Sequence, residues 1–89
     1  MKGGFFVMFY VYILYSQKLD RFYVGYTADI EKRLTEHRSG ISTYTSKATD
    51  WELKYQKGFA TRELAMEYEK SIKKKKSRKY IIWLIEQSS

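Results

Sequence analysis

The sequence predicts an α+β fold: a small three-stranded antiparallel sheet flanked by helices, in the order β-β-α-β-α-α. Two segments that look like strands stand on either side of a short polar stretch near the beginning of the chain. A third segment alternates between apolar and polar residues, and helical patterns with capping residues lie between and after the strands. The 89 residues are enough for one modest core, so we expect a single domain over residues 1–89.

The first two strands are expected to form a hairpin. Residues 9–15 are apolar or aromatic on both faces, which indicates a strand covered on both sides. Residues 16–21 are polar, and the next strand is predicted over residues 22–27. Gly25, inside that strand, indicates a bulge or a close backbone approach. If residues whose numbers sum to an odd value pair, as Tyr15 would with Phe22, then Tyr12 and Tyr23 emerge on one face of the sheet.

The remaining elements follow from capping residues and alternation. Residues 28–39 are predicted to form a helix with Thr27 as its N-cap and Gly40 just past its end. A loop is expected over residues 41–50. Residues 51–59 form the third strand, with one wet face and with Trp51, Leu53 and Tyr55 on the other face. Thr61 and Ser77 are the expected N-caps of the last two helices, which begin at residues 62 and 78.

Composition excludes several classes of protein. The chain has no cysteine, so disulfides and thiolate metal sites are excluded. The apolar stretch from Phe5 to Tyr15 is well below the roughly 20 residues needed to span a bilayer, so we expect a cytoplasmic protein with no membrane role. Met8 is a second candidate for the initiating residue, because residues 1–7 add no periodic pattern.

The net charge of +7 is concentrated in one segment. Residues 70–79 contain no acid and seven basic side chains: Lys70, Lys73, Lys74, Lys75, Lys76, Arg78 and Lys79. Such a patch attracts polyanions and releases their counterions on binding, which favours a nucleic-acid partner. Charge alone leaves two alternatives open, a solvated helix end and an anionic membrane surface.

Three charged residues stand where a helix should be apolar. At about 100° per residue, Arg33 and His37 fall on the stripe of Ile30, one turn apart. Glu69 falls on the stripe of Ala65 in the next helix. A buried carboxylate requires a cationic or metal partner. Two structural alternatives remain: an ion pair between Glu69 and Arg33, and a core histidine beside an arginine whose head group reaches solvent.

These residues together resemble the GIY-YIG nuclease superfamily. Two short strings separated by ten residues look like its paired signature: Tyr10-Val11-Tyr12 and Tyr23-Val24-Gly25. A helix with Arg33 and His37 follows, and Glu69 comes later with Ile72-Lys73 behind it. The sequence departs from the signature at Tyr10, where the name has glycine, and at Tyr26, where some repair members carry a lysine. The resemblance spans residues 9–79 and is closest to small stand-alone members.

The resemblance implies a metal-dependent endonuclease. Glu69 would hold Mg²⁺ or Mn²⁺, and Arg33 would contact the scissile phosphate. Tyr12 would position and deprotonate a water, its pKa lowered by nearby cations, while Tyr23 orients the water or phosphate. His37 would take the proton onward. We therefore expect these five side chains to converge on one concave surface, a site that would be excluded if Glu69 lay on the opposite side of the sheet.

The implied substrate is nucleic acid, and structured or damaged DNA is expected before RNA. A domain of this size leaves little room for reading base sequence, so a protein partner could supply specificity, and the oligomeric state stays open. Two other functions fit the same residues. One is a nucleic-acid-binding module of the same fold that cuts nothing. The other is a protein-interaction domain in which the aromatic residues are core and the lysines serve solubility.

Overall fold

A computed structural model describes residues 8–40 and 46–88, and it confirms the predicted α+β architecture and element order. The strands are β1 (Phe9–Ser16), β2 (Arg21–Thr27) and β3 (Glu52–Phe59). The helices are α1 (Ile30–Arg38), α2 (Arg62–Lys75) and α3 (Arg78–Gln87). Residues 1–7, which include the first part of the early apolar stretch, and residues 41–45 of the expected loop lie outside the described residues.

The sheet is antiparallel with strand order β2-β1-β3, so the doubly apolar strand is central. Its position explains why both of its faces are apolar: side chains of successive residues enter opposite cores. Tyr15 pairs with Phe22 and Tyr12 pairs with Gly25, which confirms the odd-sum register of the hairpin. In this register Tyr12 and Tyr23 point to the same face of the sheet.

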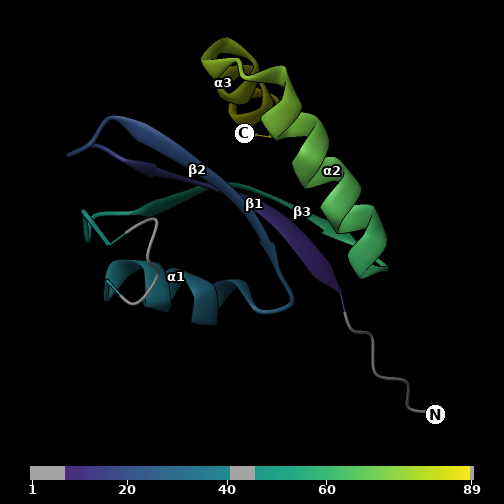
Figure 1. The fold of residues 1–89 in the computed structure, drawn as a ribbon, viewed down its shortest axis with the longest axis horizontal. Helices are drawn as coiled ribbons and strands as arrows, with labels where there is room; N and C mark the ends of the chain where they lie inside the picture. The colour runs from purple at the N-terminus through teal and green to yellow at the C-terminus, as the bar shows by residue number, and fades with distance from the viewer. Residues whose placement is uncertain (1–7, 41–45, 89) are drawn as a thin grey trace.

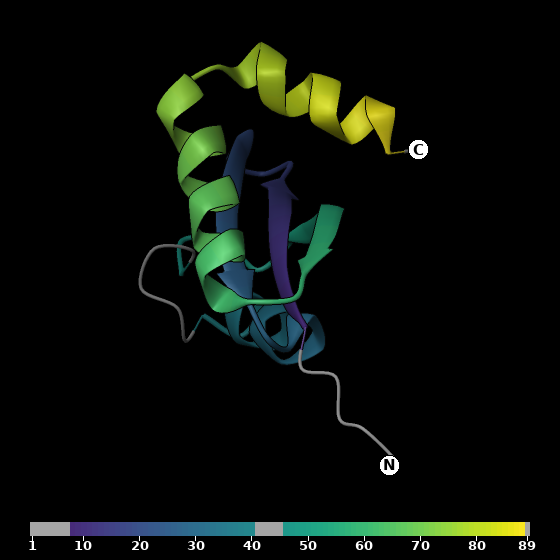
Figure 2. The same cartoon turned by 90° about the vertical axis from the view of Figure 1, so that its right-hand side faces the viewer.

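The sheet lies between two layers of helix, α1 on one face and α2 with α3 on the other (Figures 1 and 2). The core under α2 and α3 is built on six buried residues: Val11, Ile13, Val24, Ala65, Ile72 and Leu84. The core on the side of α1 is built on four: Tyr12, Leu14, Ala48 and Trp51. Figure 2 shows α2 running beside β2, which is an edge strand of the sheet.

A bulge corrects one prediction about β3. The register between β1 and β3 shifts by one residue, because Ile13 pairs with Tyr55 whereas Leu14 pairs with Leu53. A single extra residue reverses the face to which the following side chains point. Leu53 therefore packs in the core on the side of α1 and Tyr55 in the core under α2. The alternation had placed both side chains on one face.

The helix caps follow the sequence with one exception. Thr61 and Ser77 cap α2 and α3, as predicted. The N-cap of α1 is Asp29 rather than Thr27, because the Asp29 carboxylate accepts a hydrogen bond from the Lys32 amide at 3.1 Å. Thr27 instead accepts from the Asp29 amide, which orders the entry to the helix. Within the described residues, no helix is long and apolar enough to cross a membrane.

Candidate nuclease site at the edge of the hairpin

The phenol ring of Tyr12 lies across the backbone of Gly25 on the neighbouring strand. A Cβ atom at Gly25 would stand 2.7 Å from the Tyr12 hydroxyl oxygen and 3.0 Å from Cε2 of Tyr23. Glycine is therefore required for space: both tyrosine rings occupy the volume above it. The groups that approach Gly25 are these two side-chain rings rather than another backbone, and the ring centroids of the two tyrosines are 6.2 Å apart.

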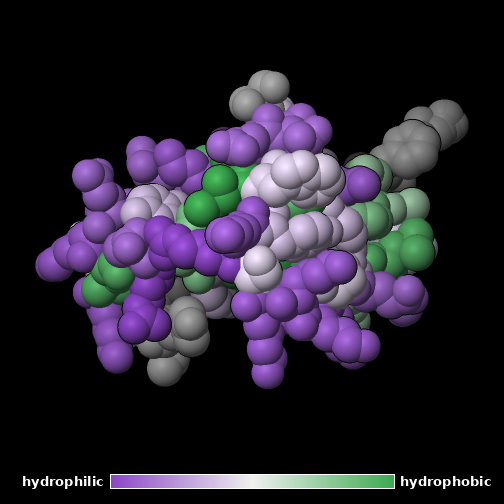
Figure 3. Space-filling view, turned by 90° about the horizontal axis from the view of Figure 1, so that it is seen from above, coloured by the Kyte–Doolittle hydropathy of each residue, from purple (hydrophilic) through white to green (hydrophobic). Residues whose placement is uncertain are grey.

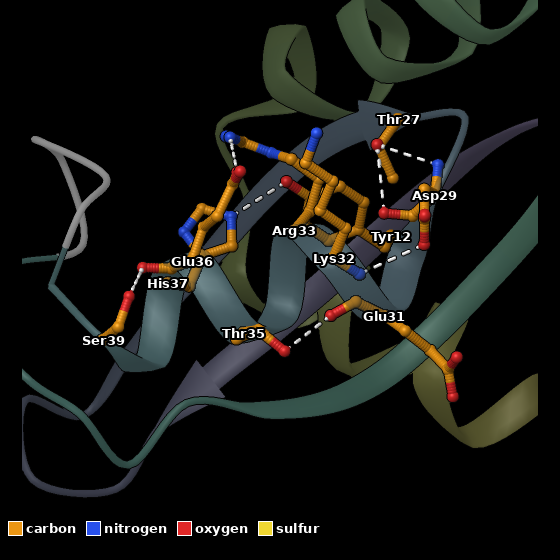
Figure 4. Close-up of polar contacts among 10 residues, drawn as sticks. All are labelled: Tyr12, Thr27, Asp29, Glu31, Lys32, Arg33, Thr35, Glu36, His37 and Ser39. Atoms are coloured by element: carbon orange, nitrogen blue, oxygen red, sulfur yellow. Dashed lines mark hydrogen bonds and ion pairs between the residues drawn. The ribbon is translucent and has the colours of Figure 1, made fainter.

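His37 completes a cluster with the two tyrosines. Its side chain is fully buried, and its Nε2 atom lies 3.0 Å from the Tyr12 hydroxyl oxygen, within hydrogen-bonding distance (Figure 4). The imidazole ring also packs against Tyr23, with ring centroids 4.9 Å apart. His37 is thus a core histidine and a neighbour of Tyr12 at once, so the structural and the functional interpretations are compatible.

Burial fixes the protonation state of this pair. It raises the pKa of Tyr12 to about 12, and the neighbouring Arg33 offsets only part of that rise. The expectation that cations bring the pKa of Tyr12 below its ordinary value is wrong for the protein without a metal. Burial, followed by the positive charge of Arg33, lowers the pKa of His37. At neutral pH the site therefore holds a protonated phenol beside a neutral imidazole.

Arg33 stands at the solvent side of this cluster. Its Nη1 atom forms an ion pair with Glu36 at 2.5 Å, three residues further along α1 (Figure 4). Burial alone would lower the pKa of Arg33, but interactions with Tyr12 and Glu36 outweigh it and raise the pKa. The alternative of an Arg33–Glu69 ion pair is not what forms, since each of these residues pairs within its own helix. The i, i+3 spacing of Arg33 and Glu36 was the signal for this pair.

Glu69 approaches from the other side of the sheet. Four of the five predicted residues lie on the side of α1, whereas α2, which carries Glu69, packs on the opposite face. The edge of β2 connects the two sides. The charge of Glu69 reaches Tyr12 and contributes to its raised pKa, and Lys73 of α2 lines one pocket together with Tyr23. Glu69 is therefore not remote from Tyr12 behind the sheet, which is the arrangement that would exclude the site, and convergence of all five side chains stays a prediction.

The Glu69 carboxylate is mostly buried, with 15% of its side chain exposed. It forms an ion pair with Lys73, whose ammonium lies 3.1 Å away and whose side chain is 53% exposed. In the described ranges, 8–40 and 46–88, no three histidine, aspartate or glutamate side chains cluster to hold a metal. Glu69 therefore offers a single carboxylate at the edge of β2, a donor set suited to an ion that keeps most of its waters.

A basic groove extends from the site toward the tip of the hairpin. The pocket at Tyr23 shares Phe22, Val24 and Lys73 with a larger one of about 630 Å³. The larger pocket runs between the β1–β2 turn and the α2–α3 junction, and its charged lining is Asp20, Arg21, Lys73, Lys76 and Arg78. Within that lining, Arg78 forms an ion pair with Asp20. Lys73 pairs with Glu69, and Arg21 and Lys76 add positive charge to the groove.

The structure divides the predicted basic patch. Lys73, Lys76 and Arg78 face the groove, whereas Lys75 lies over the ring of Tyr80 in α3. All seven basic side chains are exposed. Tyr26, where some repair members carry a lysine, packs against the core under α2, away from Tyr12. Sequence reasoning missed Glu36, although its i, i+3 spacing from Arg33 was visible. It also missed the two-sided distribution of the lysines, which depends on how the helices pack on the sheet.

The site combines three parts on one α+β fold: a hairpin with two tyrosines, a helix with Arg33 and His37, and a glutamate on a later helix. Together these parts define a GIY-YIG domain. The family described as the GIY-YIG catalytic domain matches residues 8–81, and this chain belongs to that family of endonucleases. A UPF0213 protein of Streptococcus pneumoniae serotype 4 is 40% identical over 68 residues, which cover 75% of this chain and 68% of that protein. One from Natronomonas pharaonis is 38% identical over 65 residues, 72% of this chain and 75% of that protein.

A solved structure gives the same picture. The solution NMR structure of a UPF0213 protein from Bacillus halodurans superposes with a TM-score of 0.57 at 32% sequence identity. The match covers 90% of this chain and 84% of the other. The fold and the family are therefore shared with small proteins whose names state a family and no activity.

Proposed function

We propose that this protein is an endonuclease that hydrolyses phosphodiester bonds in nucleic acid with the help of a divalent metal ion. The hydrogen bond between the Tyr12 hydroxyl and Nε2 of His37 carries the proposal. It couples a phenol to a neutral base beside an arginine. Tyr23, which packs against both, lines a pocket that adjoins the basic groove. An ordinary core places no such combination at the edge of a sheet, because three ionisable groups gain nothing there that apolar residues would not supply.

The protonation states suggest how a water is activated. A phenol with a pKa of about 12 is almost wholly protonated at neutral pH, so a free Tyr12 phenolate is rare. Tyr12 instead accepts a proton from the attacking water as its own hydroxyl proton passes to Nε2 of His37. The water oxygen bonds to phosphorus, the bond to the leaving 3′ oxygen breaks, and His37 ends as imidazolium. The 3′ oxygen leaves with the electron pair and takes its proton from a solvent water. In this scheme Tyr12 positions the water and His37 is the final proton acceptor.

Arg33 and Tyr23 act on the phosphate. The planar guanidinium of Arg33 suits two parallel hydrogen bonds to phosphate oxygens, and its raised pKa keeps it charged. A substrate phosphate would compete with Glu36 for this guanidinium. Tyr23 lies beside both Tyr12 and His37, where its hydroxyl orients the water or the phosphate.

Glu69 is the residue that would hold the metal, with waters and phosphate oxygens as the other ligands. Mg²⁺ is commonly bound by one or two carboxylates in this way, and Mn²⁺ accepts the same ligands. A bound ion supplies charge neutralisation at the phosphate and at the leaving oxygen. To bind it, Glu69 would exchange the ammonium of Lys73 for the cation. The released Lys73 would then face the groove as a phosphate contact.

The substrate is proposed to be nucleic acid of particular shape rather than sequence, with structured or damaged DNA first, by analogy with repair members of the family. Seven exposed basic side chains between residues 70 and 79 would hold the flanking backbone without reading bases. A protein partner would supply any sequence specificity. One observation favours the alternative of a binding module that does not cut: Lys73 neutralises Glu69, the carboxylate on which metal binding depends.

A cleavage screen decides between these two functions. Branched, nicked and damaged DNA duplexes and structured RNAs are incubated with the full chain and Mg²⁺ or Mn²⁺. Cleavage of any substrate that stops on chelation supports the nuclease. Tight, salt-sensitive binding with no product under any of these conditions supports the binding module. If the protein neither binds nor cleaves any of these nucleic acids, both functions are refuted. The protein-interaction domain is then the remaining alternative.

A further inference from the structure

The helix α3 presents an aromatic pair that the proposed site does not use. Trp83 is 51% exposed, and its ring stacks on Tyr80 with centroids 5.9 Å apart and an interplanar angle of 23°. The other tryptophan of the chain, Trp51, is 1% exposed. Exposing half of an indole forgoes much of the favourable free energy of its burial, so the position of Trp83 is not explained by the core.

Two lysines lie next to the pair of aromatic rings. The ammonium of Lys75 lies 5.3 Å from the centroid of the Tyr80 ring. Lys79 is exposed and precedes Trp83 by four residues, so the two share one surface of the helix. Figure 3 looks onto the face formed by α2 and α3, where pale and green side chains are gathered between purple, hydrophilic ones. Flat aromatic faces flanked by basic side chains are the feature by which proteins hold unpaired nucleotides.

We propose that Tyr80 and Trp83 form a stacking platform for a base of single-stranded nucleic acid, with Lys75 and Lys79 on the adjacent phosphates. The proposal rests on the function proposed above and names its substrate class: nucleic acid that carries an unpaired strand. The groove at the edge of β2 binds backbone near the cleavage site. The platform residues are not among those that line this groove. The platform binds unpaired bases, whose faces are inaccessible within a duplex.

Two other occupants fit the platform less well. A second copy of the chain related by a twofold axis would bring Lys75 and Lys79 of both copies together, and like charges brought together oppose association. An anionic membrane suits lysine and tryptophan. However, Leu84 of the same helix is buried in the core of the domain, so α3 offers little apolar surface for insertion into a bilayer. The near-parallel stacking of two rings matches the flat face of a base.

Tryptophan fluorescence tests the platform directly. The full chain is titrated with an oligothymidylate of about 12 nucleotides and, separately, with a blunt duplex. Because Trp51 is buried, a base that stacks on Trp83 quenches the emission of the exposed indole. Trp83→Ala is then compared with Ile82→Ala, a control at another exposed apolar residue of α3, by anisotropy of a labelled oligonucleotide. Trp83→Phe keeps an aromatic ring at the platform.

We expect Trp83→Ala to weaken single-strand binding by roughly 5- to 100-fold, the effect of losing one stacked base. Trp83→Phe should recover part of that loss, while Ile82→Ala and all duplex affinities stay within about twofold of the unchanged protein. The proposal is overturned if Trp83→Ala binds the single strand normally. It is also overturned if this variant instead loses self-association, or binding to phosphatidylserine vesicles, with single-strand affinity intact.

Failure of the platform and failure of the nuclease are separable. If Glu69-dependent cleavage is present and Trp83→Ala binds normally, Trp83 is only an exposed tryptophan and the nuclease stands. If single strands quench Trp83 but no substrate is ever cut, the platform stands and the nuclease does not.

Discussion

Gly25→Ala is the sharpest probe of the cluster, because a single methyl group would enter the volume of Tyr12. The new Cβ atom would lie 2.7 Å from the Tyr12 hydroxyl oxygen and 2.9 Å from Cζ, whereas ordinary contacts begin near 3.4 Å. The phenol must therefore retreat by about 0.7 Å, and a ring packed among buried neighbours has little room to do so. Such a shift is enough to break the 3.0 Å hydrogen bond to His37.

We expect this overpacking to cost about 1–3 kcal/mol of folding free energy, which lowers Tm by roughly 4–8 °C per kcal/mol in a domain of this size. Cleavage should fall more, by about 100-fold, because displacing a catalytic group by about 1 Å has effects of that order. Thermal unfolding and single-turnover cleavage measure the two effects. Gly58→Ala is the matched control, since its nearest contact is the terminal methyl of Met8, a flexible group that can move aside.

A Gly25→Ala protein that unfolds and cleaves like the unchanged protein would refute the reasoning. Unchanged behaviour would mean that Tyr12 does not lie across β2, or that its position is irrelevant to the reaction. If Gly25→Ala lost no more stability than Gly58→Ala, the claim of a specific clash with Tyr12 would be wrong.

Two further predictions concern pH and salt. Burial lowers the pKa of His37 below its usual 6.5, so its contribution to stability is present above pH 6.5 and is lost as the pH falls through the lower folded-state value. In thermal melts, the Tm of His37→Gln should therefore fall less steeply than that of the unchanged protein as the pH is lowered below 6.5. An equally steep fall would contradict the lowered pKa of His37. Changing Lys73–Lys76 to Gln should reduce the slope of log affinity against log salt by roughly 0.9 for each duplex phosphate that the variant no longer neutralises. If binding by that variant keeps the salt slope of the unchanged protein, these lysines do not contact nucleic acid and serve another purpose.

Much of the fold follows from local rules that the sequence displays. Alternation left only two choices for Tyr12 and Tyr23, one shared face or opposite faces, because side chains repeat with a period of two. The odd-sum register of the structure puts them on one face. The helical period placed Arg33 and His37 on the inward side of α1. His37 is indeed buried against both tyrosines.

What the sequence could not predict depends on how the elements pack. The bulge opposite Ile13 and Leu14 sends Leu53 and Tyr55 into different cores, although both fit one alternating pattern. The helical wheel put Glu69 inward but could not say which face of the sheet α2 covers. The raised pKa of Tyr12 depends on how deeply the phenol is buried, which no spacing of residues reveals.

The most direct test of the central claim is the rate of metal-dependent cleavage by Glu69→Gln. Glu67→Gln is the control, an exposed glutamate on the same helix. The substitution at Glu69 removes the carboxylate and leaves Lys73 largely in water, so the fold should persist. Loss of the metal's stabilisation of phosphate charge predicts a rate lower by at least roughly 100-fold for Glu69→Gln and an unchanged rate for Glu67→Gln. A folded Glu69→Gln protein that cuts at the wild-type rate would contradict the account.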